Sequence, residues 1–328
     1  MSDSPIREVA DGIYQIRLPL PFALNHVNCY LLHDTPGWTL VDTGLNTAPA
    51  QAAWQAAFEA LHITPAAIQR IILTHVHPDH FGMAGWFYEQ CAAPIWLSPR
   101  ERDLARLLWG GEGLLATAFD SYLHRCGMPA ESVPAVIEGM AFTAQHTFPH
   151  PPALHTLQAG ESLRVGQRTL HVHHAPGHSD GQIILYDADD RLLLSGDHVL
   201  MQITPNIGLW PDSEPNPLGR YLHSLEALDA LEVRLALPGH KAVIQDWRGR
   251  LAELRAHHAA RLQHTLAAVG GGATVYAASL QVFQTQRFSP HEWRFAMAET
   301  LAHLDVLREQ GSVQQTETAE GRWWFSRA

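Results

Sequence analysis

The segment IILTHVHPDHFG, which begins at residue 71, places three histidines and an aspartate within six positions after a short apolar run. Such a run is typical of a buried β-strand. His75 and His77 alternate along an extended segment, so their imidazoles should project to the same side. Pro78 takes the backbone out of the strand, and Asp79 and His80 follow it. Imidazole and carboxylate groups are ligands of Zn²⁺, so this is a candidate metal-binding loop.

One loop does not complete a metal site, and three later strand ends offer further ligands. At each of them an apolar run ends in glycine, and a histidine or an aspartate comes next. Glycine lets the backbone turn sharply, so the following side chain can point to a shared centre. The three candidates are His178 of PGH, Asp197 of SGD and His240 of the second PGH.

The order of the expected elements indicates an α/β fold. Strand patterns fill the first 45 residues, and helix and strand patterns then alternate up to residue 98. Strand patterns return after residue 157 and end near residue 238. Residues 98–157 carry helical patterns and no expected strand, so we interpret them as an insertion over the active site. We expect one domain over residues 1–250.

Residues 251–328 differ in character and are expected to form a second domain. Two helical segments are followed by Ser289-Pro290-His291-Glu292, a capping box that opens a third helix. The final segment, with strand patterns on both sides of AEG, is typical of a hairpin. Three helices followed by a hairpin is the order of a winged helix.

The motifs HVHPDH, APGHS, SGDH and LPGH follow VDTG in this order, and together they resemble the metallo-β-lactamase fold superfamily. The resemblance implies a four-layer αββα sandwich with the site along one edge. It also implies two metal-binding groups and one bridging carboxylate: His75, His77 and His178; Asp79, His80 and His240; and Asp197. The tail resembles a winged-helix subgroup that includes an endoribonuclease and polyketide thioesterases.

A centre of this kind implies hydrolysis by a hydroxide held between two divalent metal ions. Asp197 and Asp79 are the candidate catalytic carboxylates, with Asp197 placed to receive or orient the proton of the nucleophile. Zinc is the expected metal, and iron or manganese would suit the same ligands. No serine or cysteine nucleophile is required.

Other polar residues near the motifs have open roles. Asp42 of VDTG is either a turn residue or a partner of a metal ligand, and the sequence does not decide between them. His171 and His173 alternate on one face of a strand and are interpreted as packing residues, and the role of His174 beside them is open. His198 follows Asp197, and contact with substrate and packing are both open.

Two classes of substrate are consistent with the motifs. The first is an ester, thioester or lactone, and the alternative is a nucleic acid cleaved by a phosphodiesterase or ribonuclease. The formal net charge is −11, and residues 251–328 contain seven arginines and seven acidic residues. Nucleic-acid affinity depends largely on phosphate neutralisation, which this balance does not provide. We therefore expect a small-molecule acyl substrate and no nucleic-acid partner.

Large apolar side chains favour a substrate with an apolar portion. They lie in the insertion and in the loop after Asp197: Leu107, Leu108, Trp109, Phe119 and Tyr122; Met201, Ile203, Ile207, Leu209 and Trp210. Among these, Trp109 and Trp210 are the candidate substrate contacts. The hairpin residues Trp323 and Trp324 suit burial, which predicts a packing element or a homodimer contact for the tail.

The three cysteines are widely spaced and form no CxxC pair, which argues against a disulfide framework. The polar first residues have no apolar core of the kind a signal peptide needs, and no run is long enough to span a membrane. These features predict a cytoplasmic protein without a membrane partner.

Overall fold

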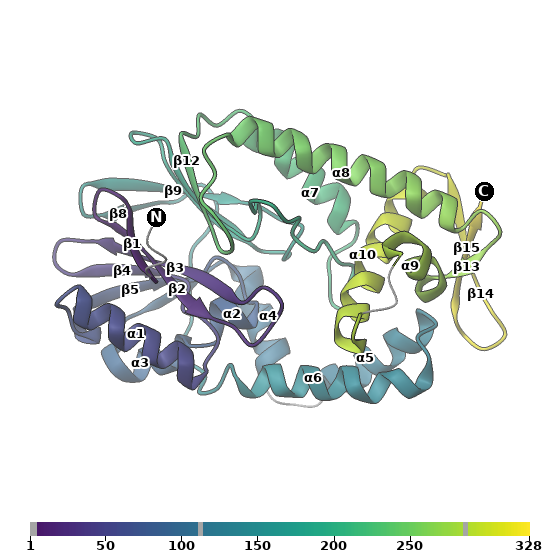
Figure 1. Ribbon diagram of the computed structural model, residues 1–328, viewed down its shortest axis with the longest axis horizontal. Coiled ribbons are helices and arrows are strands. Elements are labelled where there is room, and N and C mark those ends of the chain that lie inside the picture. Colours follow the sequence, from purple (N-terminus) through teal and green to yellow (C-terminus); the bar gives the residue numbers. More distant parts are fainter. Residues whose placement is uncertain (1–4, 111–113, 285–287) are drawn as a thin grey trace. The chain divides into compact units, whose positions relative to one another are not determined.

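The computed structural model describes residues 5–110, 114–284 and 288–328. The chain divides into two compact units (Figure 1). Unit 1 contains residues 1–110, 143–205 and 231–250, and unit 2 contains residues 111–142, 206–230 and 251–328. Residues 1–4, 111–113 and 285–287 of the expected domains and insertion lie outside the described residues.

Unit 1 is built on two sheets. The first has seven strands in sequence order: β1 (Ile6–Ala10), β2 (Ile13–Pro19), β3 (His26–His33), β4 (Trp38–Val41), β5 (Ile68–Ile72), β6 (Ile95–Leu97) and β7 (His155–Thr156). The second has five strands in the order β12 (Leu235–Pro238), β11 (Leu192–Gly196), β10 (Ile183–Asp187), β9 (Arg168–His174) and β8 (Ser162–Val165). Apolar side chains of both sheets form one buried cluster, so the sheets pack face to face.

Helices cover the first sheet on its other face. They are α1 (Ala48–Ala60) and α3 (Ala84–Cys91), and Trp54, Phe58 and Phe87 from them pack in a second buried cluster with strand residues. The Thr47 side chain caps α1 by accepting from the backbone N–H of Ala50. The short helices α2 (Pro78–Phe81) and η1 (Pro65–Ala67) and the helix α4 (Pro99–Trp109) complete the order in this part of the chain.

Unit 2 is mainly helical. Its elements are α5 (Leu114–Arg125), most of α6 (Val133–Gln145), α7 (Pro217–Leu228), most of α8 (Trp247–Ala268), α9 (Val275–Phe283), α10 (Pro290–Glu309) and a sheet in the order β13 (Ala273–Thr274), β15 (Trp323–Arg327), β14 (Val313–Glu317). The 3₁₀ turn η2 (Ala130–Ser132) precedes α6. The capping box of Ser289 and Glu292 is confirmed at the start of α10. The order of helices and hairpin is the one expected for a winged helix.

The structure corrects two details of the predicted elements. Strand β5 ends at Ile72, before Thr74, because the Thr74 N–H donates to the carboxylate of Asp42. His75 and His77 lie in the loop that follows, as the sequence predicted. The region 98–157 contains a strand after all, since β7 pairs in parallel with β6. None of the described helices combines the length and hydropathy that crossing a lipid bilayer requires.

Candidate metal centre

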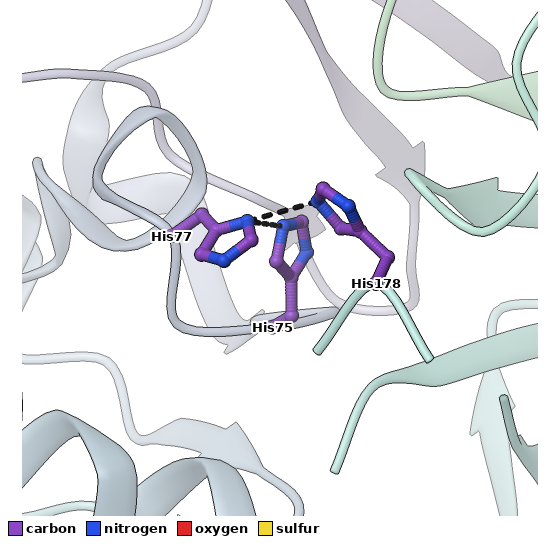
Figure 2. A group of neighbouring side chains, drawn as sticks. All are labelled: His75, His77 and His178. Atoms are coloured by element: carbon purple, nitrogen blue, oxygen red, sulfur yellow. Dashed lines mark hydrogen bonds between the residues drawn. The ribbon is translucent and has the colours of Figure 1, made fainter. Parts of the chain in front are cut away.

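Three imidazoles form the first part of the centre (Figure 2). His75 and His77 come from the loop after β5, and His178 comes from the turn after β9. His77 Nδ1 lies 3.1 Å from His75 Nε2 and 2.9 Å from His178 Nε2. Two nitrogens bound to one zinc ion at about 2.0–2.1 Å would lie about 3.3 Å apart in a tetrahedral site. The three nitrogens are thus grouped closely enough to share one cation.

The second part consists of Asp79, His80 and His240. Pro78 is the first residue of α2, which carries both Asp79 and His80. His240 Nε2 lies 3.2 Å from Asp79 Oδ2, and His80 Nε2 lies 4.0 Å from the same oxygen. Both imidazoles are fully buried. These three side chains form a second group whose ligand atoms lie within 4.8 Å of one another.

Asp197, which follows β11, lies between the two groups. Its Oδ2 is 3.6 Å from His178 Nε2 and 3.1 Å from His240 Nε2, and its Oδ1 is 3.4 Å from His80 Nε2. One carboxylate therefore contacts both groups. The structure brings together all seven side chains that the sequence offered as ligands.

Glycines before the ligands have the conformations that the motifs suggested. Gly177 and Gly196 have φ angles of +134° and +49°, which favour glycine. Gly239 is needed for space, because a Cβ atom there would collide with the carboxylate of Asp197. The sharp turns at the strand ends therefore depend on these residues.

Asp42 contacts one metal-ligand candidate directly and another through Thr74. Its Oδ2 accepts from Thr74 Oγ1 and lies 2.8 Å from His80 Nδ1, while its Oδ1 accepts from the Thr74 N–H. Thr74 Oγ1 in turn lies 3.0 Å from His75 Nδ1. Partners of this kind fix the tautomer and orientation of metal-binding histidines. The contacts favour the partner role that the sequence left open for Asp42.

Strand β3 supports His240, a contribution that the sequence did not reveal. The backbone carbonyl of His26 lies 2.7 Å from His240 Nδ1. The Asn28 amide donates to the carbonyls of Pro238 and Lys241, and the Tyr30 hydroxyl donates to Pro238 as well. These bonds hold the turn that carries His240. A strand pattern alone does not indicate which turn its residues will meet.

Electrostatics divides the centre into neutral and charged parts. Burial lowers the pKa of His75 and His77, to about 3 for His77, so both imidazoles are neutral at pH 7 and have a free lone pair. Burial acts in the same direction on His240, but the charge of Asp197 outweighs it and raises the pKa of His240 to about 10. The carboxylate of Asp197 therefore favours a positive charge at the second group.

Buried polar atoms provide a direct test of whether a metal fits. Within the described part of the chain, His80 Nε2, His240 Nε2 and Asp197 Oδ1 are buried without a hydrogen-bond partner. Leaving such atoms unsatisfied is costly unless a ligand or ion completes them. Their chemistry, imidazole nitrogen and carboxylate oxygen, suits a divalent cation. The residues present fit the implied metal ions.

The remaining candidate histidines lie outside these groups. His171 Nδ1 lies 2.9 Å from Ser162 Oγ, and His173 packs edge-on against Tyr186, in line with the expected packing roles. His174 Nε2 lies 2.9 Å from the carbonyl of Asp180. His198 is fully buried, and burial lowers its pKa to about 3.

The two candidate substrate tryptophans lie in different units. Trp109, at the end of α4, donates from Nε1 to the carbonyl of Val76 at 3.1 Å. Trp210 belongs to unit 2, where its ring packs near Phe119 and Tyr122 and lies under the guanidinium of Arg294. Phe119 and Tyr122 are each 5% exposed, so the structure places them in the core of unit 2.

Comparison with known proteins agrees with this geometry. Residues 23–240 match the family model described as the metallo-beta-lactamase superfamily. Residues 262–328 match a second model, described as the metallo-beta-lactamase-like C-terminal domain.

Individual proteins show the same similarity. A crystal structure of a metallo-beta-lactamase family protein from Thermus thermophilus is 35% identical, with a TM-score of 0.87 over 98% of this chain and 100% of that one. The "Probable metallo-hydrolase YqjP" of Bacillus subtilis is 25% identical over 92% of this chain and 94% of its own length. The "Acyl-coenzyme A thioesterase MBLAC2" of Homo sapiens is 28% identical over 71% of this chain and 80% of its own.

Proposed function

The chain belongs to the metallo-beta-lactamase superfamily, and on this premise we propose that it hydrolyses a small acyl substrate with an apolar portion. Membership of this family accounts for its α/β fold and assigns it as a metallo-hydrolase. The ester, thioester or lactone class is the finer proposal. Among these a thioester is favoured, because one relative is named an acyl-coenzyme A thioesterase.

The observation that carries the hydrolytic role is the contact of Asp197 with both histidine groups. Two divalent ions held by these groups would lower the pKa of a water molecule and polarise the bond under attack. Asp197 would join the two groups, and its Oδ1 is a buried oxygen without a hydrogen bond in the described part of the chain. That oxygen is the one that we assign to orienting the proton of the nucleophile.

The surrounding residues orient the ligands for binding cations. Asp42 Oδ2 accepts a hydrogen bond from His80 Nδ1, and the carbonyl of His26 accepts one from His240 Nδ1. Each imidazole thereby directs Nε2 towards the carboxylates of Asp79 and Asp197. We infer two divalent ions per chain, with zinc as the first candidate and iron or manganese as alternatives.

A substrate panel tests the acyl proposal. Protein with measured metal content is assayed against esters, thioesters, lactones, β-lactams and phosphodiesters. We expect turnover of at least one acyl class to exceed that of every phosphodiester. Phosphodiester cleavage well above all acyl turnover would instead support the alternative, a phosphodiesterase or ribonuclease.

A further inference from the structure

Helix α4 carries a buried acid that has no role in the chemistry proposed above. Glu101 is fully buried, and its carboxylate accepts three hydrogen bonds. Oε2 accepts from the backbone N–H of Val76 at 2.7 Å. Oε1 accepts from Ser179 Oγ at 2.5 Å and from the backbone N–H of Gly181 at 2.7 Å.

These donors belong to the two loops that carry the first three histidines. Val76 lies between His75 and His77, and Ser179 follows His178 directly. One carboxylate therefore joins two loops that are about 100 residues apart in sequence. Its Oε2 binds the first loop and its Oε1 binds the second. It contacts their backbone and a hydroxyl, and it leaves the imidazoles free to face one another.

Other contacts of α4 act on the same two loops. Trp109 Nε1 donates to the carbonyl of Val76, so α4 binds both the N–H and the C=O of that residue. Arg100 Nη2 forms a 2.8 Å ion pair with Asp180 Oδ2. Gly181 lies so close to the start of α4 that a Cβ atom would come within 2.5 Å of Ser98 Oγ. The first and last turns of α4 thus both hold the loops.

Burying a carboxylate against a helix costs desolvation free energy. In the described part of the chain no ion pair involves Glu101, and burial raises its pKa to about 7 against the effect of its three donors. An apolar side chain would usually fill such a place at lower cost. A polar group retained under these conditions indicates a requirement for its hydrogen bonds.

We propose that Glu101 is a positioning residue that holds the His75–His77 loop and the His178 loop in the arrangement that binds the first metal ion. The proposal rests on the metal centre inferred above and is independent of the substrate. Without Glu101, the two loops lose their common partner, and the three nitrogens no longer converge without reorganisation. The cost appears as lower metal affinity at the three-histidine group.

Glu101→Gln tests this with almost no change in shape. The two backbone N–H groups can only donate, and glutamine has a single acceptor oxygen. In either amide orientation one of these two N–H groups faces the NH₂ group and loses its acceptor, although the Ser179 hydroxyl can still accept from an NH₂ group placed at Oε1. We expect the affinity of one metal ion per chain to fall by about 10–100-fold, as for other partners of metal ligands.

The readouts do not depend on turnover. Metal affinity is measured by competition with a chelator, and the visible spectrum of the cobalt-substituted protein reports the geometry of the bound ion. Ser179→Ala keeps one bond to each loop and should have a smaller effect. Glu299→Gln is the matched control, a Glu-to-Gln change at a buried acid of unit 2.

Each result decides a separate point. Unchanged affinity and cobalt spectrum in Glu101→Gln, or an equal loss in Glu299→Gln, would overturn the positioning role. A wild-type protein that binds no divalent metal would instead overturn the proposed function. If Glu101→Gln does not fold, Ser179→Ala carries the test, because it removes one hydrogen bond of the Glu101 carboxylate, and wild-type affinity and cobalt spectrum in that variant would contradict the proposal.

Discussion

Asp197 is the side chain on which both metal groups depend. Because it lies within 3.6 Å of His178 and 3.1 Å of His240, Asp197→Ala should remove a ligand from each group. We expect metal affinity to fall by more than the ~10–100-fold that loss of an outer partner costs. Hydrolysis should fall with it. Elemental analysis and assays check this, with Asp229→Ala, at a half-buried acid after α7, as control. Unchanged metal content in Asp197→Ala would contradict the bridging assignment.

Asp42→Asn should act mainly on the second group, because Asp42 contacts the ring of His80 directly and that of His75 only through Thr74. Asparagine tolerates the left-handed backbone of this position, where φ is +60°, so the fold should persist. If its oxygen accepts from the Thr74 N–H, its NH₂ group donates to His80 Nδ1, and the proton of the imidazole moves to Nε2. That nitrogen then cannot bind a cation.

We therefore expect loss of one metal ion per chain in Asp42→Asn, with affinity lowered about 10–100-fold. Chelator competition separates this loss from that of Glu101→Gln, which concerns the three-histidine group. Equal weakening of both metal sites by Asp42→Asn would show that Asp42 acts on the fold of the whole centre.

The sequence predicted the positions of the metal-ligand candidates but not the contacts of Glu101. Three of the ligand candidates, His178, Asp197 and His240, follow strand ends through glycine, a local pattern with a physical cause, and the structure brings them together with the other four. Glu101 was not predictable, because Ser98-Pro99-Arg100-Glu101 has the pattern of a capping box at a helix start. Its carboxylate contacts loops that lie elsewhere in sequence, and only the tertiary structure reveals that.

At the scale of elements, helices α8 and α10 meet through two buried histidines. His258 Nδ1 lies 3.2 Å from His303 Nε2, and both side chains are fully buried. His257, Tyr221 and Arg261 also face this pair, and Glu299 lies 3.6 Å from Arg261. Burial lowers the pKa of His258 to about 2 and that of His303 to about 4.

Acid should therefore destabilise the packing of α8 on α10. Both pKa values are lower than the ~6.5 of an unfolded histidine, so the unfolded state binds more protons. The stability is fully present above about pH 6.5 and falls by up to about 1.4 kcal/mol per pH unit for each imidazole as the pH drops towards 4. Thermal unfolding between these pH values measures the loss.

His303→Gln should reduce this pH dependence, and His264→Gln, at an exposed site on α8, should leave it unchanged. The comparison between variants removes the contribution of the metal centre, which titrates equally in all three proteins. An identical pH profile for His303→Gln and wild type would contradict a role of the buried pair.

Short or non-local elements were the ones that the sequence missed. Strand β7 has two residues, too few to display an alternating pattern. The grouping of residues 111–142 with 206–230 and 251–328 depends on contacts such as Phe119 with Trp210, which have no local signal. Long amphipathic helices such as α7 and the capped helix α10 were predictable because their patterns span several turns.

At the scale of the whole molecule, charge predicts that the chain does not bind nucleic acid. The formal net charge is −11, and several arginines in the described part of unit 2 contact acidic or aromatic side chains. Arg308 pairs with Asp305, Arg255 with Asp229 and Arg125 with Glu317, while Arg294 lies over two aromatic rings. Phosphate neutralisation would require these cations to leave their present partners.

Fluorescence anisotropy of labelled duplex DNA and RNA, titrated with the full chain, measures this directly. We expect no binding at submicromolar concentration at about 0.15 M salt, and no more than weak binding at lower salt. Such complexes form because Lys and Arg neutralise phosphates and release counterions, and arginines already paired within the protein contribute little to this. The tail then serves packing or a homodimer contact, and a sedimentation measurement separates these two. Submicromolar binding whose affinity falls steeply with salt would contradict the expectation and would favour the phosphodiesterase alternative over acyl hydrolysis.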